Sequence, residues 1–117
     1  MARIQKTPKV DRADVLRVVE RDFPINASEV LSILSNIRGI VIKTDRLHLA
    51  HLKNSEGSLE KLHESLAIGD QRDVVCCAEY PNYMKLGWVA IGKLPLDEKH
   101  QIIDLDWQQY QRWLNAE

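Results

Sequence analysis

Two adjacent cysteines, Cys76 and Cys77, carry the most reactive side chains of this sequence. A thiol becomes a nucleophile or a redox group when a nearby cation favours its thiolate form, and Arg72 lies one helical turn before Cys76. Neighbouring residues of a helix point about 100° apart, so a disulfide between the two would require a disrupted helix. We therefore favour two free thiols over thiol chemistry, with a structural Cys77 that faces the core and a Cys76 that faces the outside or a helix boundary.

Three of the four histidines, His48, His51 and His63, are the candidate metal ligands. His48 and His51 are three residues apart and share one face of a helix. A structural zinc site takes about four ligands, usually including thiolates, and this spacing matches no established zinc pattern. The sequence therefore predicts no metal site and no cofactor, and we interpret the histidines as partly exposed helix residues.

The motifs that strongly indicate an enzyme are missing from the chain. It contains no G-x-S-x-G, no glycine-rich loop that would hold a phosphate, and no H-E-x-x-H. Carboxylates are abundant, but they are scattered along helix surfaces, and a catalytic pair cannot be chosen without knowing which helices face each other. We therefore favour a protein that is not an enzyme, and no catalytic residue is assigned.

Two charged residues of the helix predicted over 70–81 require an explanation. Arg72 lies in its first turn and Glu79 in its last, so both oppose the helix dipole, each at a cost of about 0.3 to 1 kcal/mol. They are seven residues apart, which places them within about 20° of each other around the axis. In one interpretation each binds a neighbouring helix. In the other they form, with Tyr80 and Tyr83, a polar strip that a protein partner binds.

Apolar periodicity and capping residues predict two helices at the start of the chain. The first begins at Asp11 or Asp14 and ends at Phe23, because proline follows and stops it. Asn26 and Glu29 are spaced as a capping box at the start of the second. The connection of about three residues makes the two helices neighbours in an αα-hairpin.

The middle of the chain is predicted to be helical as well. Gly39 ends the second helix, and the β-branched segment 40–42 is interpreted as an apolar linker that fills part of the core, since no partner strand is evident. Further helices are predicted over 43–54, between residues 58 and 69, and over 70–81. Six residues are predicted to be buried: Leu34, Leu62, Leu66, Val74, Ala78 and Trp107.

The last third of the chain leaves three questions open. Residues 83–94 could form a short helix or irregular apolar chain, because Gly87 and Gly92 weaken either structure. The pattern from Leu96 onward is helical, and 104–106 either continues this helix or divides it. The aromatic residues of this third fill the core or form an interface. In total the sequence predicts an all-α, single compact domain of five to six helices arranged as αα-hairpins.

Composition limits the partners and the compartment. The chain has 117 residues, 44% of them hydrophobic, and a net charge of −1, which gives no field to hold nucleic acid or an acidic membrane. No segment has the roughly 18 consecutive apolar residues of a membrane span, and the first residues lack the apolar centre of a signal peptide. We predict a cytoplasmic protein, with residues 1–10 as a flexible basic tail and 11–117 as a single helical domain.

Four segments resemble phrases of one protein family. Residues 46–53 (RLHLAHLK), 57–62 (GSLEKL), 72–81 (RDVVCCAEYP) and 106–114 (DWQQYQRWL) are similar to R-V-x-L-A-x-L-K, G-D-L-x-K-L, R-D-V-L-x-x-A-E-Y-P and D-W-x-Q-Y-x-x-W-L. These phrases are typical of a family of small bacterial helical proteins of unknown function. The likeness covers most of residues 11–114 and departs at Gln71, where the family commonly has tyrosine. It implies one helical domain and brings no activity.

The leading hypothesis from the sequence is a non-enzymatic protein-binding module, such as an inhibitor or an antitoxin-like partner, that works through one face. One alternative is a small enzyme or ligand-binding domain with a pocket under the C-terminal aromatics, and a deep pocket with convergent polar groups would favour it. The other alternative is a structural homo-oligomer that uses the same aromatics, which a flat, self-complementary apolar patch would favour.

Overall fold

This computed structural model describes residues 7–117, apart from the side chain of Trp88. The described residues form seven helices and no strand. The helices are α1 (Arg12–Asp22), α2 (Ala27–Ser35), α3 (Thr44–Ser55), α4 (Leu59–Leu66), α5 (Gln71–Glu79), α6 (Pro81–Lys93) and α7 (Leu96–Asn115). α6 is interrupted at Gly87, whose φ of 80° is non-helical, so it consists of two helical segments. The all-α class is confirmed. Five to six helices were too few, because Pro81 ends α5 and also begins α6.

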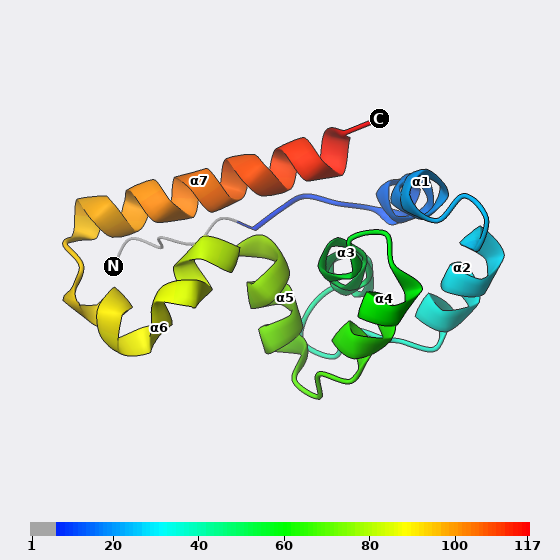
Figure 1. Ribbon diagram of the computed structural model, residues 1–117, viewed down its shortest axis with the longest axis horizontal. Coiled ribbons are helices and arrows are strands. Elements are labelled where there is room, and N and C mark those ends of the chain that lie inside the picture. The colour runs from blue at the N-terminus through cyan, green and yellow to red at the C-terminus, as the bar shows by residue number, and fades with distance from the viewer. Residues whose placement is uncertain (1–6) are drawn as a thin grey trace.

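The helices form one elongated globule of 45 × 29 × 24 Å. Helices α1 to α4 gather at one end of its long axis, α6 lies at the other end, and α7 runs along the length between them (Figure 1). α3 is central, since it contacts α1, α4 and α5. The long α7 reaches both ends, packing on α6 with its first half and approaching α1 with its last turns.

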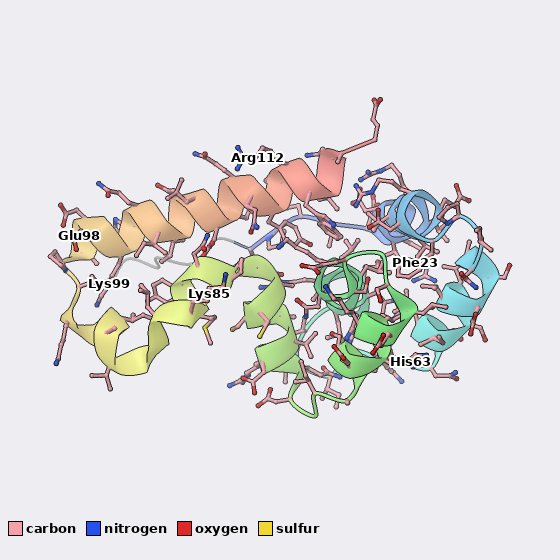
Figure 2. All side chains as sticks on the ribbon, in the orientation of Figure 1. Phe23, His63, Lys85, Glu98, Lys99 and Arg112 are labelled. Atoms are coloured by element: carbon pink, nitrogen blue, oxygen red, sulfur yellow. The ribbon has the colours of Figure 1, made fainter. Side chains whose placement is uncertain are left out.

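Two apolar clusters hold the helices together. The larger joins α1 to α4 with the last turns of α7, and its buried members are Val15, Val18, Val19, Phe23 (Figure 2), Val30, Leu34, Leu49, Leu52, Leu62, Tyr110 and Leu114. The smaller lies between α3 and α5 and contains Leu47, Ala50, Val74, Val75 and Ala78. Burying such side chains is the main favourable contribution to folding.

Four of the six residues predicted to be buried are buried, and the other two are only half-buried. Leu66 is the last residue of α4 and lies at the rim of the larger cluster. Trp107 follows the buried Asp106, and a step of about 100° turns it away from the buried face of α7. Burial therefore follows the helix phase more closely than the size of the side chain.

The capping residues of α1, α4 and α5 lie where the sequence predicted them. The carboxylate of Asp11 accepts the backbone N–H of Asp14, and Asp14 accepts that of Asp11, which completes a capping box. Ser58 and Asp70 likewise accept backbone N–H groups at the starts of α4 and α5. These signals were readable because each cap lies next to its own helix.

Two predictions about α2 are wrong in detail. Asn26 does precede the helix, but its side chain forms no hydrogen bond to the backbone and instead contacts the Glu29 carboxylate at 3.3 Å. The helix ends at Ser35, before Gly39, because residues 36–43 leave helical geometry and form an irregular loop. α2 is therefore short, and the connection to α3 is longer than expected.

The predicted orientation of the two cysteines is also wrong. Cys77 is exposed and Cys76 half-buried, and both thiols are free. The buried face of α5 is formed by Val74, Val75 and Ala78 and extends to Glu79, which leaves Cys77 beyond its edge. Burial raises the pKa of the Cys76 thiol, and the nearby Glu79 carboxylate adds to this, so the conditions for a reactive thiolate are absent there.

A buried carboxylate answers the open question at 104–106. α7 is continuous through this segment, and Asp106 is 0% exposed. Its carboxylate accepts the backbone N–H groups of Asn82 at 3.1 Å and Tyr83 at 3.0 Å, and the side-chain amide of Asn82 at 2.9 Å. Asp106 therefore caps α6 from α7, where a negative charge also suits the helix dipole. The cap helps 81–93 to be helical despite its two glycines.

The N-terminal tail predicted over 1–10 is described only in part. Residues 1–6 lie outside the described residues. Pro8 is buried, and Val10 packs against the larger apolar cluster.

Among the helices of residues 7–117, none is both long enough and apolar enough to cross a bilayer.

His48 and His51 are buried, in contrast to the partial exposure that the sequence predicted. Arg12 donates to Nδ1 of His48 over 3.1 Å, which leaves Nε2 to donate to the Ile37 carbonyl over 2.8 Å. Nδ1 of His51 lies 2.8 Å from the hydroxyl of Ser65. Burial lowers the pKa of both imidazoles, and it lowers that of His51 to about 4.

Acid should therefore destabilise the fold before the carboxylates titrate. Between pH 6.5 and about 4 the unfolded chain binds a proton at His51 that the folded chain does not bind. The free energy of unfolding should fall across this range by roughly 2 to 3 kcal/mol. Urea titrations at several pH values should show a shallower dependence for His51→Gln, and an identical slope in both proteins would contradict this assignment.

Core packing at α4 gives a second expectation. Leu62 is fully buried, so Leu62→Ala should lower the free energy of unfolding by roughly 2 to 5 kcal/mol, since it leaves a cavity. Leu105 is 58% exposed, and Leu105→Ala should change the same quantity by about 0.5 kcal/mol or less. Equal effects of the two substitutions in urea unfolding would show that the assigned core is incorrect.

Candidate partner-binding surface

Two adjacent apolar residues in the loop between α2 and α3 project into solvent. Ile40 is 87% exposed and Val41 77% exposed, whereas Ile42 is half-buried and packs against the smaller apolar cluster. The interpretation of 40–42 as a linker filling the core is therefore correct for Ile42 and wrong for its two neighbours. Exposed apolar residues are ordinary when they are scattered, and Ile40 and Val41 differ in being adjacent, which makes this loop a candidate surface for a partner.

Gln71 fixes the backbone of this loop from outside it. Its side-chain Nε2 donates to the carbonyl of Arg38 over 2.9 Å, and its Oε1 accepts the N–H of Ile40 over 3.1 Å. One amide thus binds both a donor and an acceptor of the loop, which holds the loop at the start of α5. This is the residue that departs from the family pattern, and here its amide has a defined structural role.

Close contacts within the loop fix it further. The N–H of Gly39 donates to the hydroxyl of Thr44 over 3.0 Å. A Cβ at Gly39 would lie 1.8 Å from the carbonyl oxygen of Ile42, so any other residue would force the loop open. At the first end of the loop, His48 holds the carbonyl of Ile37. The loop is therefore held at several points along its backbone.

Two hollows flank the loop, and Val41 and Ile42 line both. The smaller, of about 360 Å³, opens toward the start of α5 and is completed by Ile40, Gly69, Asp70, Gln71 and Arg72. The larger, of about 810 Å³, opens toward the N-terminal segment and is completed by Thr7, Pro8, Lys9, Val10, Asp11, Lys43 and Arg46. We call the loop residues 40–42 with these two hollows the loop surface.

The four residues that the sequence suggested for partner binding are not equally accessible. Glu79 is 3% exposed, Tyr80 is 5% exposed and Tyr83 is half-buried, while Arg72 is exposed. The guanidinium of Arg72 forms no hydrogen bond or ion pair with any described residue, and it lines the smaller hollow. The structure thus brings Arg72, but neither Glu79 nor Tyr80, to the loop surface.

The apolar part of the surface, Ile40 and Val41, was assigned to the core from the sequence. A signal was present, because a β-branched run between two helices had no strand to pair with. What the sequence did not give is the direction in which the side chains point. That direction depends on hydrogen bonds from Gln71, more than thirty residues away.

Glu79 forms a buried ion pair with Arg46 of α3. The two N–H···O distances are 2.8 Å from Nε and 2.7 Å from Nη2, the parallel geometry typical of a bidentate pair. This hydrogen bonding and the carboxylate charge raise the pKa of Arg46. Burial raises the pKa of the adjacent Tyr110 of α7, and the charge of Glu79 adds to the effect. The salt bridge to a neighbouring helix is therefore confirmed for Glu79.

A further hollow of about 700 Å³ lies beside Trp113, where the sequence suggested a ligand pocket. Arg21 stacks over the Trp113 ring at 5.3 Å and donates to the Trp113 carbonyl at 2.6 Å and to the Asp22 carboxylate at 2.8 Å. Lys53 contacts the amide oxygen of Gln109 at 3.4 Å, and burial lowers its pKa. These polar groups bind one another, which favours a structural role for this site.

Comparisons of the chain with protein-family models, with curated proteins and with solved structures find no match. The likeness of four segments to a family of small bacterial proteins therefore stays a prediction. Two of these segments, 46–53 and 72–81, meet in the fold, since Arg46 belongs to one and Glu79 to the other. Their shared residues thus include a contact that holds the helices together.

The Arg46–Glu79 ion pair should contribute strongly to stability, whereas the exposed Arg72 should contribute little. Glu79→Gln leaves the guanidinium of Arg46 without its charged partner, and the free energy of unfolding should fall by about 3 kcal/mol. Arg72→Gln removes a charge that binds no described residue, and the same quantity should change by about 0.5 kcal/mol or less. Chemical unfolding distinguishes them, and equal losses would mean that Arg72 also fixes α5 in the fold.

Proposed function

We propose that this protein is a non-enzymatic protein-binding module whose partner binds the loop surface. The observation that carries the proposal is the exposure of Ile40 and Val41 on a backbone that Gln71 and Gly39 hold in place. Covering each of these side chains with a partner would contribute roughly 1.5 to 3 kcal/mol to binding. An inhibitor or an antitoxin-like protein is one form that such a module takes.

The rigidity of the loop supports this proposal. Association costs free energy when flexible segments must be ordered, and a loop that is already fixed avoids most of that cost. The surface also has the composition of an interface, because an apolar centre at Ile40 and Val41 is surrounded by charged residues such as Lys43 and Arg72. Both properties suit a partner that binds by contact rather than by chemistry.

Two further statements belong to the proposal. We propose that the chain is a member of the small bacterial helical family that segments 46–53 and 72–81 resemble, which brings a fold but no activity. We also propose that it acts in the cytoplasm, a reducing compartment that suits the free thiols of Cys76 and Cys77. A single helical domain over 11–117 suffices for the binding role.

Site-specific photo-crosslinking in the native host tests the proposal. A photo-reactive phenylalanine analogue at position 41 should give discrete adducts with a protein partner. The same analogue at position 25 is the matched control, because Ile25 is 91% exposed but lies in the turn between α1 and α2, outside the loop surface. Equal adducts at the two positions, or none at position 41, would refute the proposal.

The paired substitution Ile40→Ser with Val41→Ser should separate binding from folding. Because both side chains are exposed, the free energy of unfolding should change by about 0.5 kcal/mol or less. The adducts captured from a neighbouring crosslinker position, such as 43, should disappear, since the apolar centre of the interface is gone. Retained adducts in a folded variant would show that these residues do not carry the binding.

A further inference from the structure

We propose that the partner of the loop surface is an acidic, apolar peptide segment, whose apolar side chains enter the two hollows and whose carboxylates pair with Lys43 and Arg72. This inference rests on the proposed function and adds the chemical class of the partner. It follows from the excess of cations over carboxylates around the loop and from the shape of the surface.

The exposed side chains around the loop are mostly cationic. Arg72 borders the smaller hollow, and Lys9 and Lys43 border the larger. Arg38, whose carbonyl Gln71 binds, is exposed in the loop itself. None of these four cations forms an ion pair with a described residue. Each is therefore available to a carboxylate from outside the chain.

The carboxylates that line the hollows are fewer than the cations. Only two line the hollows: Asp11 accepts the N–H of Asp14 at the start of α1, and Asp70 accepts the N–H of Arg72 at the start of α5. Glu79 lines neither hollow and is buried against Arg46, which lines the larger one. Asp11 and Asp70 keep their charges, but the three cations of the hollows that have no ion-pair partner among the described residues outnumber them, although the whole chain has a net charge of −1.

The positions of the cations suggest how a peptide would lie. Val41 and Ile42 separate the two hollows, with Arg72 beyond one and Lys43 beyond the other. A peptide crossing this ridge would place apolar side chains in both hollows and an acidic residue toward each cation. Opposite charges at the rim of an interface speed association and select the partner, and both effects weaken as salt is added.

An anionic lipid surface has related chemistry, but the shape of the site favours a peptide. Insertion into a bilayer suits a protruding apolar tip with cations around its base. Ile40 and Val41 do project into solvent, but they also border hollows of about 360 and 810 Å³, which a planar headgroup layer would leave unfilled. Side chains of a folded or extended peptide fill such spaces.

Selection of short random peptides on the full chain tests the inference. The probe is a displayed library, counter-selected on the Ile40→Ser, Val41→Ser protein so that only peptides needing the apolar loop survive. The surviving peptides should combine Asp or Glu with large apolar residues. Their affinity should fall with added salt, and by about tenfold with Lys43→Glu or Arg72→Glu. Changing the acidic residues of a peptide to lysine should restore binding to the reversed-charge protein.

Arg112→Glu is the matched control for these charge reversals. Arg112 is exposed on α7 and directed away from the other helices, outside the loop surface (Figure 2). The substitution alters the net charge by the same amount, so it should leave peptide affinity nearly unchanged. An equal loss with Arg112→Glu would show that only the overall charge matters, which would overturn pairing with Lys43 and Arg72.

The remaining outcomes separate this inference from the proposed function. Surviving peptides that are neutral or basic would overturn the acidic class while leaving a protein-binding loop intact. Absence of any peptide that requires Ile40 and Val41 would overturn both. Binding to phosphatidylserine vesicles but not to phosphatidylcholine vesicles, lost in the Ile40→Ser, Val41→Ser protein, would replace the peptide with a lipid surface.

Discussion

The ion pair between Arg46 and Glu79 is the contact on which the arrangement of the helices depends. A carboxylate that is 3% exposed must have its charge compensated inside the protein, so α5 packs on α3 only where Arg46 can reach it. This requirement sets the register in which Val74 and Ala78 meet the apolar face of α3. It also orients both ends of α5, from which the α2–α3 loop and α6 take their positions.

The loop surface depends on the same helix. Gln71 stands at the start of α5 and Glu79 at its end, so the helix that is locked to α3 also carries the amide that holds the loop. The loop surface is therefore attached to a helix that a buried electrostatic contact holds in place. The exposure of Ile40 and Val41 to water is unfavourable in free energy. Covering these side chains would recover that free energy, and little further cost would arise from ordering a loop that is already held in place.

The sequence predicts well those features whose cause is local. Asp11, Ser58 and Asp70 cap the helices that directly follow them, and the helical spacing of apolar residues predicts the all-α class. The sequence fails to predict features whose cause lies elsewhere in the chain. Asp106 caps α6 by accepting the N–H of Asn82, 24 residues earlier, and the amide of the distant Gln71 holds the apolar loop in its outward position. In the loop surface, the charge of Arg72 can be recognised from the sequence, whereas the direction in which Ile40 and Val41 point depends on tertiary contacts.

The participation of α7 in the larger core affects how the protein is made. Tyr110 and Leu114 complete the cluster of α1 to α4, and Arg21 of α1 binds the carbonyl of Trp113 near the end of α7. During translation α1 to α4 emerge well before α7, so the part of the larger cluster that Tyr110 and Leu114 cover stays open until α7 has been synthesised. A chain that ends before residue 110 lacks both Tyr110 and Leu114 and cannot complete this core.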